Sequence, residues 1–151
     1  MKLIINEKTV KDLSGNVRWF IKRNSPWTFK LDFTITDVSR QRVVQFRGKK
    51  HFLGRFHLEE DGREVAEFVE EFTFSKARLH ITGTNLRLDG TLYSREHTVF
   101  DGDAPIMYIE KPRDGLIYGE YRLDLENDQD ELLAIGIVLV IDSCFRDVGV
   151  G

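Results

Sequence analysis

Cysteine is almost absent from this chain of 151 residues, which contains Cys144 and no other. A single cysteine excludes an internal disulfide framework and any zinc site that needs several thiolates. A nucleophilic thiol would need an exposed, electropositive site with a base nearby. We therefore expect Cys144 to be a buried thiol at the end of a helix, where it packs against its neighbours.

Targeting segments and linkers are also missing. The N-terminal stretch MKLIINEKTVKD has an apolar run of only three residues, so neither a secretory signal nor a transit peptide is visible. No linker rich in glycine and serine and no low-complexity tract interrupts the chain. We therefore expect one domain over residues 1–151 and a cytoplasmic protein, with a monomer as the default state.

The net charge of −3 is small, but the charges are distributed unevenly along the chain. Residues 1–57 hold 13 Lys and Arg against 4 Asp and Glu, a balance of +9, whereas residues 58–151 hold 9 against 21, a balance of −12. Such asymmetry is typical of a side that faces nucleic acid or a membrane. The alternative interpretation is that basic and acidic strands are neighbours in the fold and form cross-strand charge pairs.

Apolar and polar residues alternate over most of the chain. In WTFKLDFTITD one face carries Trp27, Phe29, Leu31, Phe33 and Ile35, and this period of two predicts a half-buried β-strand. The segment GLIYGEYRLDLE, residues 115–126, repeats the pattern. Shorter strands are expected at residues 17–23, 43–47, 51–58, 64–74, 77–82, 86–93, 97–100 and 106–110. Trp27 is therefore expected in the core, whereas the pattern assigns no face to Trp19.

Turn residues separate several of these strands. Asp61-Gly62, Asp89-Gly90 and Asp101-Gly102 are dipeptides that supply the positive φ angles of hairpin turns. Short strands at this spacing predict an antiparallel sandwich or barrel.

Residues 132–141 form a run of ten apolar residues within NDQDELLAIGIVLVIDSCF. Asp128 is followed three residues later by Glu131, a capping-box spacing that predicts a helix from about residue 129 to 145. The apolar run is shorter than the roughly 18 to 20 residues that a membrane span needs, and Asp142 interrupts it. A transmembrane helix is therefore not expected.

A helix that is apolar on every side must be surrounded by protein. Ten or more antiparallel strands can surround one helix only if their sheet closes around it. Ala134 and Gly136 would let strand side chains approach the helix axis. The expected fold class is thus mainly β, a closed antiparallel β-barrel that encloses a hydrophobic C-terminal helix.

The stretch YRLDLENDQD, followed by ELLAIGIVLVIDSCF, resembles the C-terminal signature of the LURP-one-related group within the tubby C-terminal-like superfamily. The stretch FTITDVSRQRVVQFRGKKHFLGRFHLEEDGREVAEFVEEF is similar to the N-terminal strands of that group. The resemblance runs from about Lys22 to Phe145 and implies a barrel of about twelve strands around the helix. Tubby-like members bind phosphoinositides, phospholipid scramblases are distant relatives, and the small LURP-one-like members have no established activity.

The only basic cluster that suggests a function surrounds the turn at Gly48. In tubby-like proteins a basic loop after an early barrel strand holds the lipid head group, and Arg47, Lys49 and Lys50 occupy a comparable point here. Arg42 and Arg55 extend the cluster. Arg42, Arg47, Lys49, Lys50 and Arg55 are therefore the candidates for binding an anionic head group, because such charges are each worth about 1 kcal/mol near an anionic surface. The alternative is that this cluster is an ordinary solvated hairpin tip.

The leading functional hypothesis is a non-enzymatic binding or scaffold domain that contacts anionic phospholipid through its basic N-terminal portion. In that case the protein would be peripheral at a membrane. Phosphates of nucleic acid offer similar chemistry, but nucleic acid ranks below lipid as a partner. The alternative is a domain that binds a small ligand or a protein partner, with no membrane role. Interleaved acidic and basic strands, or a cavity beside the helix, would favour that alternative.

No catalytic residue, metal site or cofactor is expected. The histidines His51, His57, His80 and His97 do not form pairs with the spacing of a zinc helix motif, and His51 and His57 are expected to be solvated. Asp101 and Asp103 lack the further oxygen donors of a calcium loop and are interpreted as a turn. Glu70 and Glu71 cannot act as an acid–base pair, because neighbouring strand residues point to opposite faces.

Overall fold

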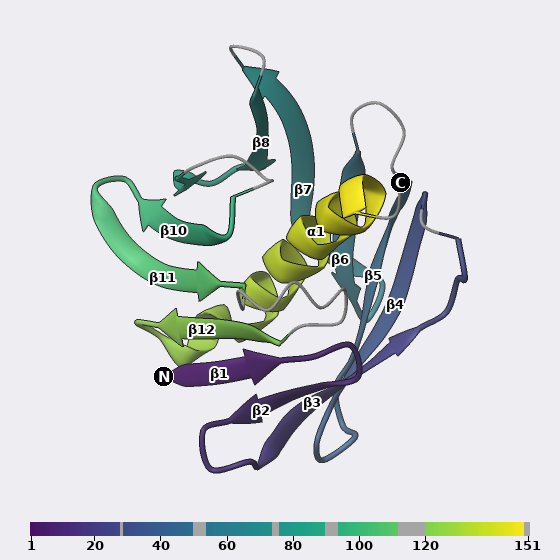
Figure 1. Ribbon diagram of the computed structural model, residues 1–151. Helices are drawn as coiled ribbons and strands as arrows, with labels where there is room; N and C mark the ends of the chain where they lie inside the picture. The colour runs from purple at the N-terminus through teal and green to yellow at the C-terminus, as the bar shows by residue number, and fades with distance from the viewer. Residues whose placement is uncertain (28, 50–53, 74–75, 90–93, 112–119, 150–151) are drawn as a thin grey trace.

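The described part of the chain contains twelve strands and one long helix (Figure 1). The computed structural model describes residues 1–27, 29–49, 54–73, 76–89, 94–111 and 120–149. The strands are β1 (Lys2–Ile5), β2 (Thr9–Asp12), β3 (Val17–Arg23), β4 (Lys30–Asp37), β5 (Val43–Lys49), β6 (Arg55–Glu60), β7 (Arg63–Thr73), β8 (Lys76–Ile81), β9 (Leu86–Leu88), β10 (Glu96–Asp101), β11 (Ala104–Glu110) and β12 (Tyr121–Leu125). A 3-10 turn at Asp128–Asp130 leads directly into helix α1 (Glu131–Gly149).

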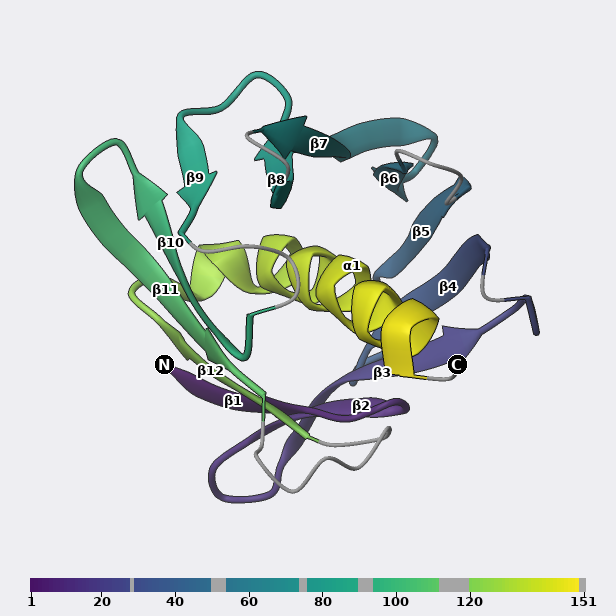
Figure 2. The same ribbon diagram turned by 45° about the horizontal axis from the view of Figure 1, so that its top comes forward.

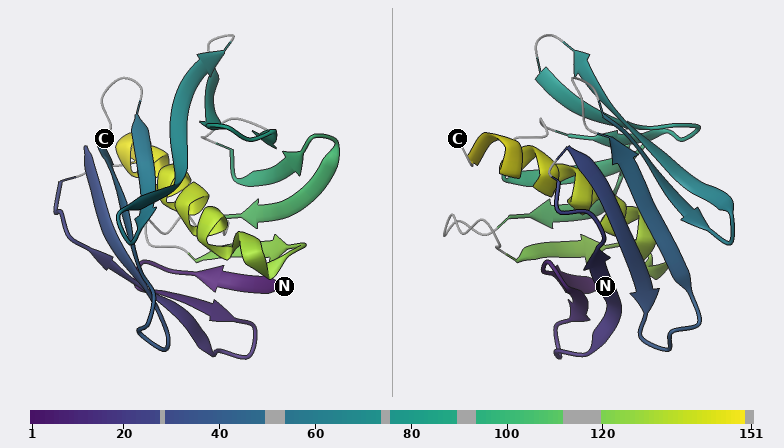
Figure 3. Two further views of the ribbon diagram at one scale, coloured as in Figure 1. Left: turned by 180° about the vertical axis from the view of Figure 1, so that it is seen from behind. Right: turned by 90° about the vertical axis from the view of Figure 1, so that its right-hand side faces the viewer.

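The strands form a closed antiparallel barrel. Each strand pairs with its neighbours in the chain, and β1 pairs with β12, with Leu3 opposite Leu123, to close the ring. Figure 2 shows α1 running through the interior with strands on several sides of it, and the two views of Figure 3 agree. The structure confirms the expected fold class: twelve strands enclose a hydrophobic C-terminal helix.

The alternating pattern located ten of the twelve strands but missed β1 and β2. These two strands have four residues each, too few for a period of two to be recognised. The turn dipeptides behave as expected where they are described: Asp61 and Gly62 have φ angles of 54° and 74°, and Gly102 has 60°. Gly90 lies outside the described residues.

Helix α1 begins without the predicted capping box. Residues 128–130 form a 3-10 turn, and the carboxylate of Glu131 accepts hydrogen bonds from Arg18 and Trp19 of β3. The Glu131 carboxylate is buried inside the barrel wall. Its hydrogen-bond donors are therefore the side chains of Arg18 and Trp19, and not a backbone N–H group as in a capping box. Among the described residues, no helix is both long enough and apolar enough to span a bilayer.

One side of α1 packs against a group of phenylalanines. Phe46, Phe56 and Phe68 project inward from β5, β6 and β7 and are fully buried, with the rings of Phe46 and Phe56 stacked at 5.8 Å between centroids. Gly136 faces them: a Cβ atom built on it would lie 2.5 Å from Cζ of Phe68. The prediction that Gly136 allows close approach of strand side chains is confirmed. Cys144 is buried, also as expected.

The expected burial of Trp27 and Phe29 is wrong. Trp27 is 61% exposed and Phe29 is 50% exposed, whereas Leu31 is buried. Strand β4 begins only at Lys30, which lies opposite the last residue of β5 in the ladder. The alternation therefore continues past the end of the barrel wall, where no interior remains to cover a side chain.

Replacing Ile137 with Asp should prevent folding. Ile137 is 1% exposed inside the barrel, so the new carboxylate would lose its hydration without gaining a partner. This costs several kcal/mol of a total stability of about 5 to 15 kcal/mol. Leu13→Asp is the control, because Leu13 lies in an exposed turn. A cooperative thermal melt of Ile137→Asp close to that of the parent would contradict the enclosure of α1.

Replacing Gly136 with Ala should lower the free energy of unfolding, although Ala favours helices by about 1 kcal/mol relative to Gly. The added methyl group would overlap the ring of Phe68, and overpacking of this kind costs about 1 to 3 kcal/mol. Urea denaturation measures the balance. In a Phe68→Leu background the same substitution should do less harm, because the ring that it meets has been removed. Equal losses in both backgrounds would show that the contact does not matter.

Candidate functional site

The residues of the predicted basic site do not all lie at one place in the structure. Arg42 directly precedes the strand and Lys49 ends it, so about 20 Å of extended chain separates them. Lys49 lies opposite Arg55 of β6 in the ladder. Lys50 lies outside the described residues. The structure therefore brings Lys49 and Arg55 together and places Arg42 at the other end of the barrel.

Each arginine of that predicted site is paired with a carboxylate of a neighbouring strand. The pairs are Arg42–Glu60, with hydrogen bonds of 2.8 and 2.9 Å, Arg47–Asp32, at 3.5 Å, and Arg55–Glu67, at 3.2 Å. The hydrogen bonds from Arg42 lower the pKa of Glu60 below its usual value. Basic and acidic residues of neighbouring strands are thus paired in this part of the barrel. This agrees with the alternative interpretation of the charge asymmetry, in which basic and acidic strands are neighbours.

A row of cations and a pair of aromatic rings occur together at one end of the barrel. Lys30 lies opposite Lys49, and Lys49 lies opposite Arg55, so three cations, here called the cation row, cross three strands. The rings of Trp27 and Phe29, here called the aromatic rim, lie 5.8 Å apart just before β4. Sequence reasoning missed this rim because it placed both rings in the core.

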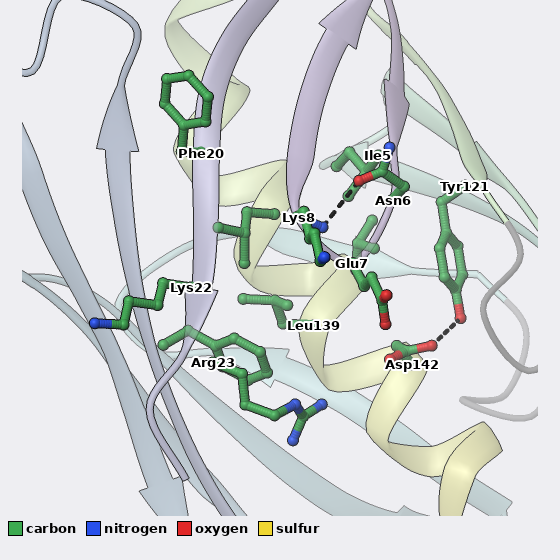
Figure 4. A pocket seen from close by; sticks show the side chains of 13 residues that line it. Ile5, Asn6, Glu7, Lys8, Phe20, Lys22, Arg23, Tyr121, Leu139 and Asp142 are labelled. Carbon is green, nitrogen blue, oxygen red and sulfur yellow. Dashed lines mark hydrogen bonds between the residues drawn. The ribbon is translucent and has the colours of Figure 1, made fainter. Parts of the chain in front are cut away.

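A cavity of about 540 Å³ lies at the same end, between α1 and the strands β1, β3, β4 and β12 (Figure 4). Its apolar wall includes Ile21, Phe33 and Tyr121 from the strands and Val138 and Leu139 from the helix. Phe33 and Tyr121 come from faces that the alternation assigned, and Val138 and Leu139 come from the apolar run at residues 132–141. Their meeting at a cavity could not be read from the sequence.

Charged side chains lie around this apolar wall. Lys8 and Glu7 come from the turn between β1 and β2, and Arg23 ends β3, with its guanidinium 4.7 Å from the centre of the Phe33 ring. The hydroxyl of Tyr121 donates a hydrogen bond to Asp142, at 3.1 Å (Figure 4). The cavity therefore combines an apolar interior with charges of both signs at its edge.

A second hollow, of about 510 Å³, lies at the start of α1 and is more polar. Its central group is Glu131, which accepts hydrogen bonds from Nε of Arg18 at 3.0 Å and from the indole of Trp19 at 2.7 Å. Buried charges are usually paired in this way, because an unpaired one costs several kcal/mol. The arrangement is a structural link between α1 and β3.

The residues considered for catalysis are arranged much as expected. Glu70 points into the barrel and Glu71 out of it, and Asp101–Ala104 is the turn between β10 and β11. His57 is partly exposed, as predicted, but His97 is buried. His51 lies outside the described residues.

Comparisons with known proteins agree with the barrel. A family model described as LURP-one-related matches residues 2–142. A curated relative from Bacillus subtilis (strain 168), described as an uncharacterized protein YxjI, is 31% identical over 110 residues, which cover 72% of this chain and 67% of the relative. No solved structure gives a significant match.

Proposed function

The chain belongs to the LURP-one-related family, and from this premise we propose that it is a binding domain whose cavity beside α1 takes a small amphipathic molecule. The observation that carries the proposal is the cavity itself, which pairs an apolar wall with charged groups at its edge. Fold alone would not support it, because one fold hosts many functions.

The size and lining of the cavity suit such a ligand. Its volume of about 540 Å³ falls within the range of about 300 to 1,000 Å³ that is typical of small-molecule sites. An apolar body would lie against Val138 and Leu139, and a polar end would reach Arg23 and Lys8. An anionic end is favoured, because three cations, Lys8, Lys22 and Arg23, and two carboxylates line the cavity.

The lining residues favour binding over catalysis. The described residues around the cavity include no His, Cys or Ser that could act as a nucleophile or shuttle a proton at neutral pH. Of the two carboxylates, Asp142 already accepts a hydrogen bond from Tyr121. We therefore assign the cavity to recognition of a ligand and not to its conversion.

Filling the cavity should abolish binding of an anionic amphiphile. Leu139 lines the cavity and is 8% exposed, so Leu139→Trp should occupy part of its volume and weaken binding of anilinonaphthalene sulfonate by more than about tenfold, or 1.4 kcal/mol. Fluorescence titration measures the affinity, and a thermal melt checks that each protein is folded.

The matched control is Leu132→Trp. Leu132 has the same exposure of 8% and lies on the same helix, two turns earlier, beside the other hollow. This variant should bind the probe like the parent. Loss of binding in both variants, or in neither, would argue against the cavity as the site.

The cation row and the aromatic rim support a second candidate function, contact with an anionic phospholipid surface. Lysines near such a surface contribute about 1 kcal/mol each, and Trp side chains partition to the membrane interface. This candidate retains Lys49, Lys50 and Arg55 of the predicted site and adds Lys30 and Trp27. It omits Arg42, which lies at the other end of β5, and Arg47, which is not part of the cation row.

Removing two cations of the row should weaken membrane binding. The double variant Lys30→Ala with Lys49→Ala should co-sediment less with anionic liposomes at low salt, and the difference should shrink at high salt because ions screen surface charges. The control is the double variant Lys2→Ala with Lys11→Ala. It removes the same charge from β1 and β2, at the end of the barrel opposite the cation row. Equal sedimentation of the two double variants with anionic liposomes would contradict this candidate function. A parent protein that binds neutral liposomes as well as anionic ones would contradict it too.

A further inference from the structure

A β-bulge interrupts the hairpin of β6 and β7. Leu58 pairs with Ala66, but the next residue, Glu59, pairs with Glu64, so Val65 has no partner in the ladder. Val65 is 52% exposed. One extra residue on one strand re-aims the side chains that follow it.

The bulge brings three potential metal ligands to one face of the hairpin. Residues three apart in a regular strand point to opposite faces, but the extra residue places Glu64 on the same face as Glu67. His57 of β6 lies directly opposite Glu67 in the ladder, and its Nδ1 contacts a carboxylate oxygen of Glu64. One nitrogen or oxygen atom from each of the three side chains lies within 4.8 Å of the others.

Neighbouring residues hold Glu67 in place. The hydroxyl of Thr82 donates a hydrogen bond of 2.7 Å to Oε1 of Glu67, and Oε2, which also accepts from Arg55, lies 3.7 Å from Nδ1 of His57. Arg55 also donates to this carboxylate, at 3.2 and 3.3 Å. Carboxylates that bind metals are usually oriented by hydrogen bonds of this kind.

We propose that His57, Glu64 and Glu67 form a surface site for a divalent transition metal of the zinc class. One imidazole nitrogen with two carboxylate oxygens is a donor set that zinc accepts, whereas calcium and magnesium prefer oxygen alone. Three protein ligands leave at least one coordination position for water or for a group from another molecule. The site lies on the outer face of β6 and β7, away from the cavity beside α1, so it goes beyond the proposed ligand binding.

The site would act as a clamp on the bulged hairpin. Glu64 and Glu67 stand on the two sides of Val65, and His57 belongs to the opposite strand. A metal that binds all three would tie the strands together at the point where the ladder is interrupted. Because the unfolded chain does not hold these ligands in place, metal binding should stabilise the folded protein.

The experiment is a titration of the metal-free protein, residues 1–151, with Zn²⁺. Isothermal calorimetry measures binding, and the thermal unfolding midpoint measures stabilisation. The parent should bind zinc and melt at a higher temperature in its presence. His57→Ala and Glu67→Gln should each weaken zinc binding by more than about tenfold. Loss of a residue that only supports a metal ligand already costs about 10- to 100-fold in metal affinity. His80→Ala is the matched control, because His80 lies on the neighbouring strand β8, opposite Val69.

Each outcome decides the proposal. Normal zinc binding by His80→Ala with loss in His57→Ala and Glu67→Gln supports it. Equal zinc affinity in the parent and in His57→Ala overturns it, as does a parent that shows neither heat nor a shift of the midpoint at about 1 mM Zn²⁺. If His57→Ala melts earlier than the parent but responds equally to zinc, the three residues form only an ion-pair cluster and the proposal is wrong.

Discussion

The enclosure of an apolar helix is the constraint on which the rest of the structure depends. Helix α1 buries Ile135, Val138, Ile141 and other residues on every side, so no single sheet face could cover it. A closed ring of strands satisfies this requirement and at the same time leaves no exposed sheet edge, which removes a common route to aggregation. The hydrophobic effect of burying the helix and the backbone pairing of the strands therefore favour the same topology.

The cavity follows from how unevenly the helix is surrounded. On one side, the rings of Phe46, Phe56 and Phe68 fill the space so closely that the helix needs Gly136 there. On the other side, shorter aliphatic residues such as Ile5 and Ile21 face the helix, and about 540 Å³ remains. The exposed residues Glu7 and Lys8 also line this space, so it opens to the surface. A hollow of this kind offers an apolar wall to a ligand that enters from solvent.

Much of the fold could be predicted from the sequence, because it rests on two long-range regularities. The period of two in segments such as residues 31–35 and the apolar run at 132–141 together imply a barrel around a helix. Burial of Trp27 was predicted wrongly, because periodicity does not show where a strand stops being covered. Glu131 was assigned to a cap, because its partners Arg18 and Trp19 are more than a hundred positions away in the chain. The bulge at Val65, which joins His57 to two glutamates, depends on strand register and leaves no pattern in the sequence.

The hollow at the start of α1 and the cavity at the other end of the barrel differ in their linings. At the start of α1, the carboxylate of Glu131 is buried and held by Arg18 and Trp19, so a ligand there would have to replace a buried ion pair, whose disruption costs about 3 to 5 kcal/mol. At the other end, Lys8 stands beside an apolar wall that α1 shares with β3. A ligand that enters there would gain contact with this apolar wall. For this reason we propose the cavity, and not the hollow around Glu131, as the ligand site.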